Sequence, residues 1–141
     1  MKNILVLIDG SEPSLRAIQY ALTLAQRVED ATVHVVNIQV PITPGRAARF
    51  FSQEVLEDYY SEEGHHVMAK ANEILADAPV KVIKKVIVGK LEDSVRDYIE
   101  DHECSHAVMG TRGLSAVPGI FLGSVTTRMI QAVDIPLTLV K

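Results

Sequence analysis

The chain of 141 residues has a single cysteine, Cys104. Without a second thiol it cannot form an intrachain disulfide, so it does not belong to the small secreted proteins that disulfides hold together. No apolar run approaches the ~18 residues of a membrane span. The opening MKNILVLIDG lacks the small-residue cleavage site of a signal peptide. We therefore expect a cytoplasmic protein with no membrane segment.

The sequence also lacks an excess of basic residues. Its 14 Lys and Arg are outnumbered by 18 Asp and Glu, for a formal net charge of −4. A nucleic-acid-binding domain needs a clustered basic surface, so this balance argues against that function. Internal repeats and low-complexity segments are absent as well. A chain of this length, 48% hydrophobic, suits one domain over residues 1–141 with a substantial buried core.

Apolar runs alternate with helical patterns along the chain. Continuous apolar or β-branched runs predict strands at 3–9, 31–38, 80–89, 106–110 and 135–140. Between them, helical spacing predicts a helix that Ser11 caps and that runs to Ala25, and further helices at 52–76, 91–102 and 124–133. This order predicts an α/β fold: a five-stranded, mainly parallel open sheet with helices on both faces, a Rossmann-like nucleotide-binding sandwich.

Open sheets of this kind bind ligands beyond the carboxyl ends of their strands, where the strand order reverses. The strand ends at Asp9, Ile38 and Gly110 are therefore the first positions to consider. Asp9 on its own is a weak signal, because an acid after a first strand also stabilises the start of a helix.

Half of the glycines lie in one stretch, MGTRGLSAVPGIFLGSV, residues 109–125. Gly110 ends a predicted strand, Gly113 follows three residues later, and Gly123 with Ser124 opens a predicted helix. Unpaired N–H groups and the helix dipole make such a helix start an anion site, and glycine lets backbone approach a phosphate without a Cβ. We interpret the stretch as phosphate-binding rather than as a set of turn glycines. It matches neither the Walker motif nor the dinucleotide fingerprint.

The spacing G-x2-G-x9-G-S, formed by Gly110, Gly113, Gly123 and Ser124, resembles the ATP-binding branch of the universal stress protein family. The resemblance covers the whole chain, including ILVLIDGSEPSLRAIQYALTLA, VHVVNI, VIVGK, AVMGTRGLS, LGSV and IPLTLVK. It implies an ATP-binding sensor or regulator of a stress response. A divalent ion such as Mg²⁺ would accompany the triphosphate, and AMP or ADP is less expected.

The resemblance also implies roles for ten residues. The Asp9 carboxylate would accept hydrogen bonds from ribose hydroxyls, and the Ile38 backbone would read the adenine edge. Met109 and Gly110 would line the adenine and ribose. The phosphates would be surrounded by Arg112, Gly113, Gly123, Ser124, Val125 and Thr126. No residue stands out as a dedicated metal ligand, and the strand at 135–140 resembles a segment that many members pair across a homodimer.

Two departures from the family pattern are visible. His106 stands where members often have an aspartate, and the linker LSAVPGIFL lacks the basic residues that many members carry there. The linker therefore supplies little positive potential near the phosphates.

Other functions fit the sequence less well. An interaction protein of the same fold, independent of nucleotide, would use the glycine loop only structurally, and the intact motif disfavours it. A receiver domain needs an aspartate after the third strand, where this chain has VIVGK. Ser11, Ser124 and Cys104 lack an identifiable histidine partner, so we expect ATP hydrolysis to be slow at most.

Three remaining clusters are read as structural. HECSH, residues 102–106, straddles a predicted helix end and strand start, so we do not expect a metal site there. Tyr59 and Tyr60 are expected to pack. Arg46 and Arg49 are expected in a solvated loop near the end of the second strand.

Overall fold

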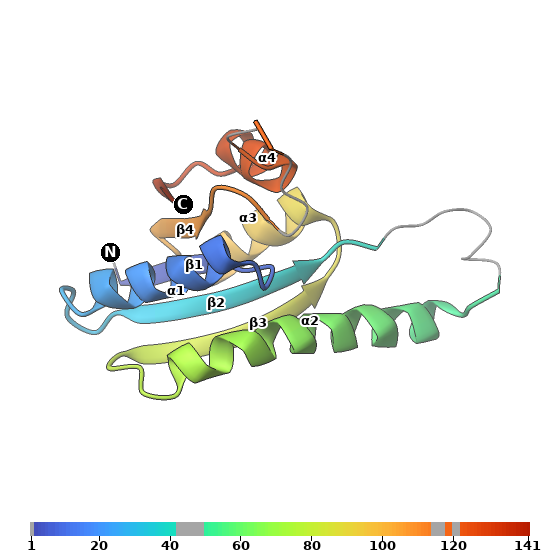
Figure 1. Cartoon of the computed structure of the whole chain (residues 1–141), viewed down its shortest axis with the longest axis horizontal. Helices are drawn as coiled ribbons and strands as arrows, with labels where there is room; N and C mark the ends of the chain where they lie inside the picture. The colour runs from blue at the N-terminus through green and yellow to red at the C-terminus, as the bar shows by residue number, and fades with distance from the viewer. Residues whose placement is uncertain (1, 42–49, 114–117, 120–121) are drawn as a thin grey trace.

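In a computed structural model, which describes residues 2–41, 50–113, 118–119 and 122–141, strands and helices alternate from one end of the chain to the other (Figure 1). The strands are β1 (Asn3–Leu7), β2 (Thr32–Gln39), β3 (Lys81–Val88), β4 (His106–Gly110) and β5 (Leu137–Val140). The helices are α1 (Glu12–Ala25), α2 (Gln53–Leu75), α3 (Leu91–Asp101) and α4 (Ser124–Ala132). Each predicted element is present. None of the helices in the described ranges has both the length and the apolar character needed to cross a membrane.

The five strands form one sheet in the order β3-β2-β1-β4-β5, and every neighbouring pair is parallel. The chain adds strands outward from β1 to β3, then crosses to the other side of β1 for β4 and β5. The strand order therefore reverses between β1 and β4. The predicted fold class is confirmed, and the reversal fixes the place where such a sheet opens beyond its strand ends.

Two separate cores lie on the two faces of the sheet. Alternate residues of β1 point to opposite sides, with Ile4 and Val6 facing α1 and α2, and Leu5 and Leu7 facing α3 and α4. Both faces are apolar because helices cover both, which explains the unbroken apolar runs in the strands.

The fully buried residues of helix α2 all lie in its second half. Its buried residues are Gly64, Met68, Ala71 and Leu75. A Cβ on Gly64 would overlap a methyl group of Val86 and lie 3.0 Å from Asn37 Oδ1, so glycine lets the helix approach β2 and β3 closely here. No residue before Gly64 in α2 is buried, and Figure 1 shows this first half extending past the sheet. The packing expected of Tyr59 is therefore wrong, because its side chain is 57% exposed.

A polar cluster lies near the amino-terminal ends of β1 and β2, and its central residues His34 and Tyr98 are buried. His34 of β2 lies with Nδ1 2.9 Å from the Tyr98 hydroxyl and Nε2 3.3 Å from Asn3 Oδ1, and the rings of Tyr98 and His102 stack 3.9 Å apart. Burial first, and then the nearby His102 and Lys81, lower the pKa of His34. Burial also raises the pKa of Tyr98 to about 12. The fold thus holds His34 neutral, with both ring nitrogens partnered.

This cluster predicts a loss of stability in mild acid. The unfolded chain regains the ordinary histidine pKa of about 6.5 and then binds more protons than the folded chain. The contribution of His34 is therefore complete above about pH 6.5 and is lost as the pH falls through the lower pKa of the folded state. Measured by urea unfolding, the free energy of unfolding should fall less between about pH 7.5 and about pH 5 in His34→Gln than in the wild type. The exposed His65→Gln is the control and should keep the wild-type slope. If the free energy of unfolding fell equally with pH in His34→Gln and the wild type, His34 would not be the source of the acid sensitivity.

Candidate functional site

The turn between β1 and α1 places Asp9 at the point where the strand order reverses. Gly10 adopts a left-handed backbone conformation, with φ of +84°, which glycine accepts more readily than other residues. The turn brings the Ser11 N–H 2.9 Å from Asp9 Oδ1, and Ser11 then caps α1 by accepting from the Ser14 N–H at 3.3 Å. One carboxylate oxygen of Asp9 is thus fixed by the backbone, and the side chain as a whole stays partly exposed.

The end of β4 sits directly on the start of α1. A Cβ on Gly110 would lie 2.8 Å from Pro13 Cβ and 3.1 Å from Ser14 N, so a larger residue would push the strand and the helix apart. Met109, just before it, is only 4% exposed and packs in the core on the α3 and α4 side. Sequence reasoning missed Pro13 and Ser14 as the support beneath Gly110, because nothing in their own pattern indicates this contact.

Gly113 and Gly123 bring the next loop against Asp9. A Cβ on Gly113 would overlap Asp9 Oδ2, and a Cβ on Gly123 would lie 3.4 Å from Arg112 Cα and 3.5 Å from Gly113 N. The Gly123 N–H donates to the Thr111 carbonyl oxygen at 2.9 Å, which ties the start of α4 to the end of β4. The structure therefore gathers Asp9, Gly113 and Gly123, which are far apart in the sequence, at one edge of the sheet.

Helix α4 presents the donors of its first turn at this edge. Gly123 is the N-cap, with no side-chain capping hydrogen bond, and the Thr127 N–H donates back to the Gly123 carbonyl oxygen at 3.0 Å. The N–H groups of Ser124, Val125 and Thr126 precede that bond and have no partner within the helix. The side chains of Ser124 and Val125 are exposed, so this helix start is open to solvent.

Thr126 differs from its neighbours because it is buried, at 2% exposure. Its hydroxyl donates to the Gly110 carbonyl oxygen at 3.0 Å. A hydroxyl has one hydrogen to donate, and a phosphate oxygen can only accept, so this bond withdraws the Thr126 side chain from direct phosphate contact. Its structural role is to hold α4 to the end of β4.

Ile38 and Arg112 border the same edge. The register of β1 and β2 pairs Leu7 with Val36, so Ile38 lies two residues beyond the last pair, at the same end of the sheet as Asp9. The Ile38 side chain is half-buried and packs with the α3 and α4 core. Arg112 is exposed in the loop after β4. Arg46 and Arg49 lie outside the described residues, as does most of the linker between Gly113 and Gly123.

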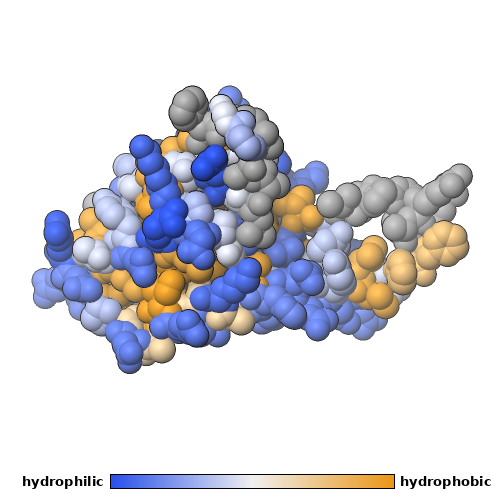
Figure 2. Space-filling view, viewed as in Figure 1, coloured by the Kyte–Doolittle hydropathy of each residue, from blue (hydrophilic) through white to orange (hydrophobic). Residues whose placement is uncertain are grey.

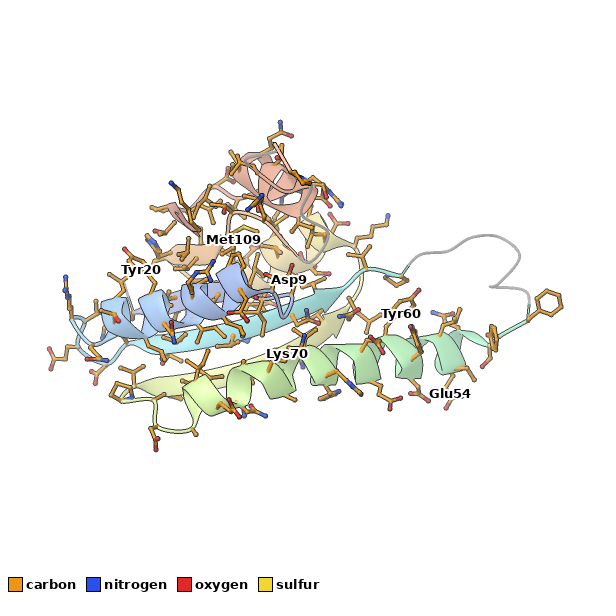
Figure 3. All side chains as sticks on the ribbon, in the orientation of Figure 1. Asp9, Tyr20, Glu54, Tyr60, Lys70 and Met109 are labelled. Atoms are coloured by element: carbon orange, nitrogen blue, oxygen red, sulfur yellow. The ribbon has the colours of Figure 1, made fainter. Side chains whose placement is uncertain are left out.

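Lys70 of α2 lies against the β1–α1 turn, which no sequence pattern indicated. Its Nζ would be 3.4 Å from a Cβ on Gly10, and Figure 3 shows it reaching from α2 toward the turn that holds Asp9. A groove beside this turn is lined by Gly10, Glu12, Leu15, Ala69, Lys70 and Glu73. Two carboxylates flank the single ammonium group, so the groove itself is a poor place for a phosphate.

The HECSH segment sends its side chains to different places. His102 stacks on Tyr98, Cys104 is buried, and His106 Nε2 lies 2.7 Å from the Thr138 hydroxyl on β5. Within the described ranges, no three His, Cys, Asp or Glu side chains converge to hold a metal ion.

A model of the universal stress protein family matches residues 1–141. The chain belongs to the universal stress protein family. Among its relatives is the universal stress protein MJ0531 of Methanocaldococcus jannaschii, which is 30% identical over 99% of this chain and 82% of its own length. The family predicted from the glycine motif is thus confirmed.

Solved structures share the fold of this universal stress protein. The protein MJ0577 has a TM-score of 0.83 at 24% identity, covering 99% of this chain and 95% of its own. A universal stress protein from Archaeoglobus fulgidus, in complex with dAMP, has a TM-score of 0.70 at 19% identity, covering 100% of this chain and 98% of its own. Two further structures are an Arabidopsis thaliana family member with AMP bound (TM-score 0.66, 16% identity) and a universal stress protein in complex with cAMP (TM-score 0.70, 23% identity). At these identities the likeness shows the fold alone.

The site geometry of this universal stress protein predicts the effect of Thr126→Val. The change keeps the shape of the side chain but removes the donor to the buried Gly110 carbonyl oxygen. We expect a loss of about 1–3 kcal/mol in the free energy of unfolding, measured in urea, because a buried acceptor loses its partner. Thr127→Val is the matched control: its exposed hydroxyl bonds Gly123 O at 3.0 Å, and its loss should stay within about 0.5 kcal/mol. Equal losses for the two variants would show that the bond to Gly110 does not hold α4 in place.

Proposed function

We propose that this universal stress protein binds ATP at the carboxyl ends of β1 and β4 and acts in the cytoplasm as a nucleotide-dependent sensor or regulator of a stress response. The observation that carries the proposal is the convergence of Asp9, Gly113 and the start of α4 at the reversal of strand order. Sheets of this architecture bind ligands at this point. The nucleotides named for the A. fulgidus, A. thaliana and cAMP-bound family members support a nucleotide as the ligand.

The nucleoside half of the ligand would lie toward β1 and β2. Asp9 is an acceptor held in place by the Ser11 N–H, which suits it to receive hydrogen bonds from ribose hydroxyls. The Ile38 backbone, at the same end of the sheet as Asp9, would meet the adenine edge. The end of β4 at Met109 and Gly110 would close the other side. Since the Met109 side chain is in the core, its contribution would come from the backbone.

The phosphates would lie toward α4. The Gly113 and Gly123 backbones would lie alongside the phosphate chain, and the first N–H groups of α4, on Ser124, Val125 and Thr126, would donate to its oxygens. The Ser124 hydroxyl and the Arg112 guanidinium, both exposed, would add a donor and a positive charge. These donors would also reach the β- and γ-phosphates, which AMP lacks in full and ADP in part, so we expect ATP to bind more tightly than either.

Magnesium would arrive with the nucleotide. The described residues offer no converging set of metal-binding side chains, so Mg²⁺ would be held chiefly by the phosphate oxygens, as a complex with ATP. When bound, the ion would offset phosphate charge in a chain whose net charge is −4.

The same geometry favours sensing over catalysis. Asp9 already accepts from the Ser11 N–H and lies where the ribose would bind, so it is poorly placed to activate a water at the γ-phosphate. We therefore expect turnover of ATP to be slow.

Thermal unfolding of the nucleotide-stripped protein tests ATP binding directly. A ligand at 100 times its Kd adds about 2.7 kcal/mol to the free energy of unfolding. For a chain of this size that should raise the Tm by about 5–10 °C with ATP and Mg²⁺, and by less with AMP. If millimolar ATP gave no shift, the nucleotide-independent interaction protein would be the better assignment.

Site variants localise the binding. Gly113→Val places a side chain against Asp9 Oδ2, and Asp9→Ala removes the ribose acceptor. Each should weaken ATP at least about tenfold, or about 1.4 kcal/mol, by titration calorimetry. Gly119→Ala is the control, because a Cβ there meets no atom within 4 Å, so only the backbone is strained. If Gly113→Val bound ATP as tightly as the wild type, the phosphates could not lie at this loop.

We further propose a homodimer through the C-terminal segment 135–140, which contains β5 (Leu137–Val140). The strand lies at one end of the sheet order. The Ala107 N–H donates to the Pro136 carbonyl oxygen at 2.9 Å and the Thr111 N–H to that of Val140 at 2.8 Å, so even-numbered residues of β5 face β4. The backbone groups of Leu137 and Leu139 then point outward. An edge of this kind can pair with the same edge of a second copy.

Leu139→Pro tests this pairing. Proline removes the outward N–H of residue 139 and leaves the groups that face β4 in place. We expect sedimentation velocity to show a dimer for the wild type and a monomer for Leu139→Pro. Leu139→Ala is the control for lost packing, because it keeps the N–H and should remain dimeric. A Leu139→Pro dimer as stable as that of the wild type would contradict pairing at this edge.

A further inference from the structure

Four large apolar side chains are exposed where α2 begins. Phe50, Phe51, Val55 and Tyr59 are 82%, 53%, 50% and 57% exposed, and we call these four residues the α2 tip. Figure 2 shows hydrophobic residues gathered at the end of the molecule where α2 begins. Large apolar side chains brought together on a surface, rather than scattered singly, mark interaction sites.

The helical residues of the α2 tip, Val55 and Tyr59, do not continue the face of α2 that packs on the sheet. An α-helix turns about 100° per residue, so Tyr59 lies about 140° and Val55 about 180° around the axis from the buried Gly64. These two side chains point away from the face by which α2 packs on the sheet. Extending the sheet under the helix would leave them uncovered. Packing of α2 on the sheet therefore does not explain Val55 and Tyr59.

Acidic side chains border the α2 tip. Over residues 53–63 the helix has five acidic residues and no basic one, and all five are exposed: Glu54, Glu57, Asp58, Glu62 and Glu63. This segment alone carries a charge of −5, against −4 for the entire chain. The rest of the chain, which includes Arg46 and Arg49 just before Phe50, therefore sums to +1. The described helix turns that carry Val55 and Tyr59 are acidic.

We propose that the α2 tip is a docking surface for a basic amphipathic segment of another protein, with apolar side chains against the tip and Lys or Arg against the acidic border. Charge decides between the possible occupants. The tip of a second copy would bring another five carboxylates to the interface, and an anionic lipid surface would repel the helix in the same way. A segment with an apolar stripe flanked by bases satisfies both features, in the way that an amphipathic helix binds a complementary surface. The surface does not depend on nucleotide binding.

The test uses the full chain and a fluorescent probe peptide. The probe is an amphipathic helix of about 15 residues made of Leu and Lys, and its control has Glu in place of Lys. By fluorescence anisotropy, the Leu–Lys probe should bind the wild type and the Leu–Glu probe should bind at least tenfold more weakly. Raising the salt from about 0.1 M to about 1 M should weaken the Leu–Lys complex, because the Debye length falls from about 10 Å to about 3 Å.

Matched variants place the binding on the molecule. Val55→Gln with Tyr59→Gln should weaken the probe at least tenfold, whereas Tyr20→Gln with Ile130→Gln, which removes apolar residues 43% and 47% exposed elsewhere, should not. A third variant, Glu54→Gln, Glu57→Gln and Asp58→Asn, keeps the apolar residues and should lose affinity and salt dependence together. Glutamine is a good helix former, so far-UV circular dichroism should stay unchanged in the first two variants.

Three results would overturn the proposal. The first is equal affinity of the probe for both double variants, and the second is a preference for the Leu–Glu probe. The third is self-association of the wild type in sedimentation velocity that Val55→Gln with Tyr59→Gln abolishes. That last result would make the α2 tip an interface between copies of this chain.

Discussion

The candidate site depends on how closely three backbone segments approach one another at the reversal of strand order. Gly110 touches the start of α1, Gly113 touches the Asp9 carboxylate, and Gly123 touches the loop at Arg112 and Gly113. At the first two of these positions an added Cβ would overlap an existing atom, whereas at Gly123 it would make van der Waals contact at 3.4 Å with Arg112 Cα. The glycines thus act first by letting β4, α1 and α4 meet, and the open helix start that suits a phosphate is a result of that meeting.

Polar groups are paired inside the protein at the amino-terminal end of the sheet and exposed to solvent at its carboxyl end. At the amino-terminal end His34, Tyr98, Asn3 and His102 satisfy one another inside the protein, and burial keeps His34 neutral. At the carboxyl end Asp9 keeps one carboxylate oxygen free of the Ser11 N–H, and the first turn of α4 faces solvent. Unsatisfied groups gather where a ligand can reach them, and satisfied groups where it cannot.

Much of this arrangement could be predicted from the sequence. Unbroken apolar runs indicated strands covered on both faces, which the structure confirms. The spacing of Gly110, Gly113, Gly123 and Ser124 indicated a strand end and a helix start, both of which the structure shows, and anion binding there stays a prediction. The contact of Gly110 with Pro13, the Thr126 hydroxyl bond and the position of Lys70 could not be predicted. Each joins residues distant in the sequence, and their distance depends on the strand order and not on any local pattern. Tyr59 was expected to pack because it is a large aromatic residue, but its position on the helix turns it away from the face that carries Gly64, Met68 and Ala71.

The way α2 packs leaves the length of its first half free to vary. All the fully buried residues of the helix lie from Gly64 onward, so the buried core does not set how many residues precede that glycine. Each residue added or removed there would move the end of the helix by about 1.5 Å and turn it by about 100°, with no change in the packing of the sheet. The first half of α2 thus acts as a spacer, and the number of its residues sets how far its start lies from the core and which way it faces.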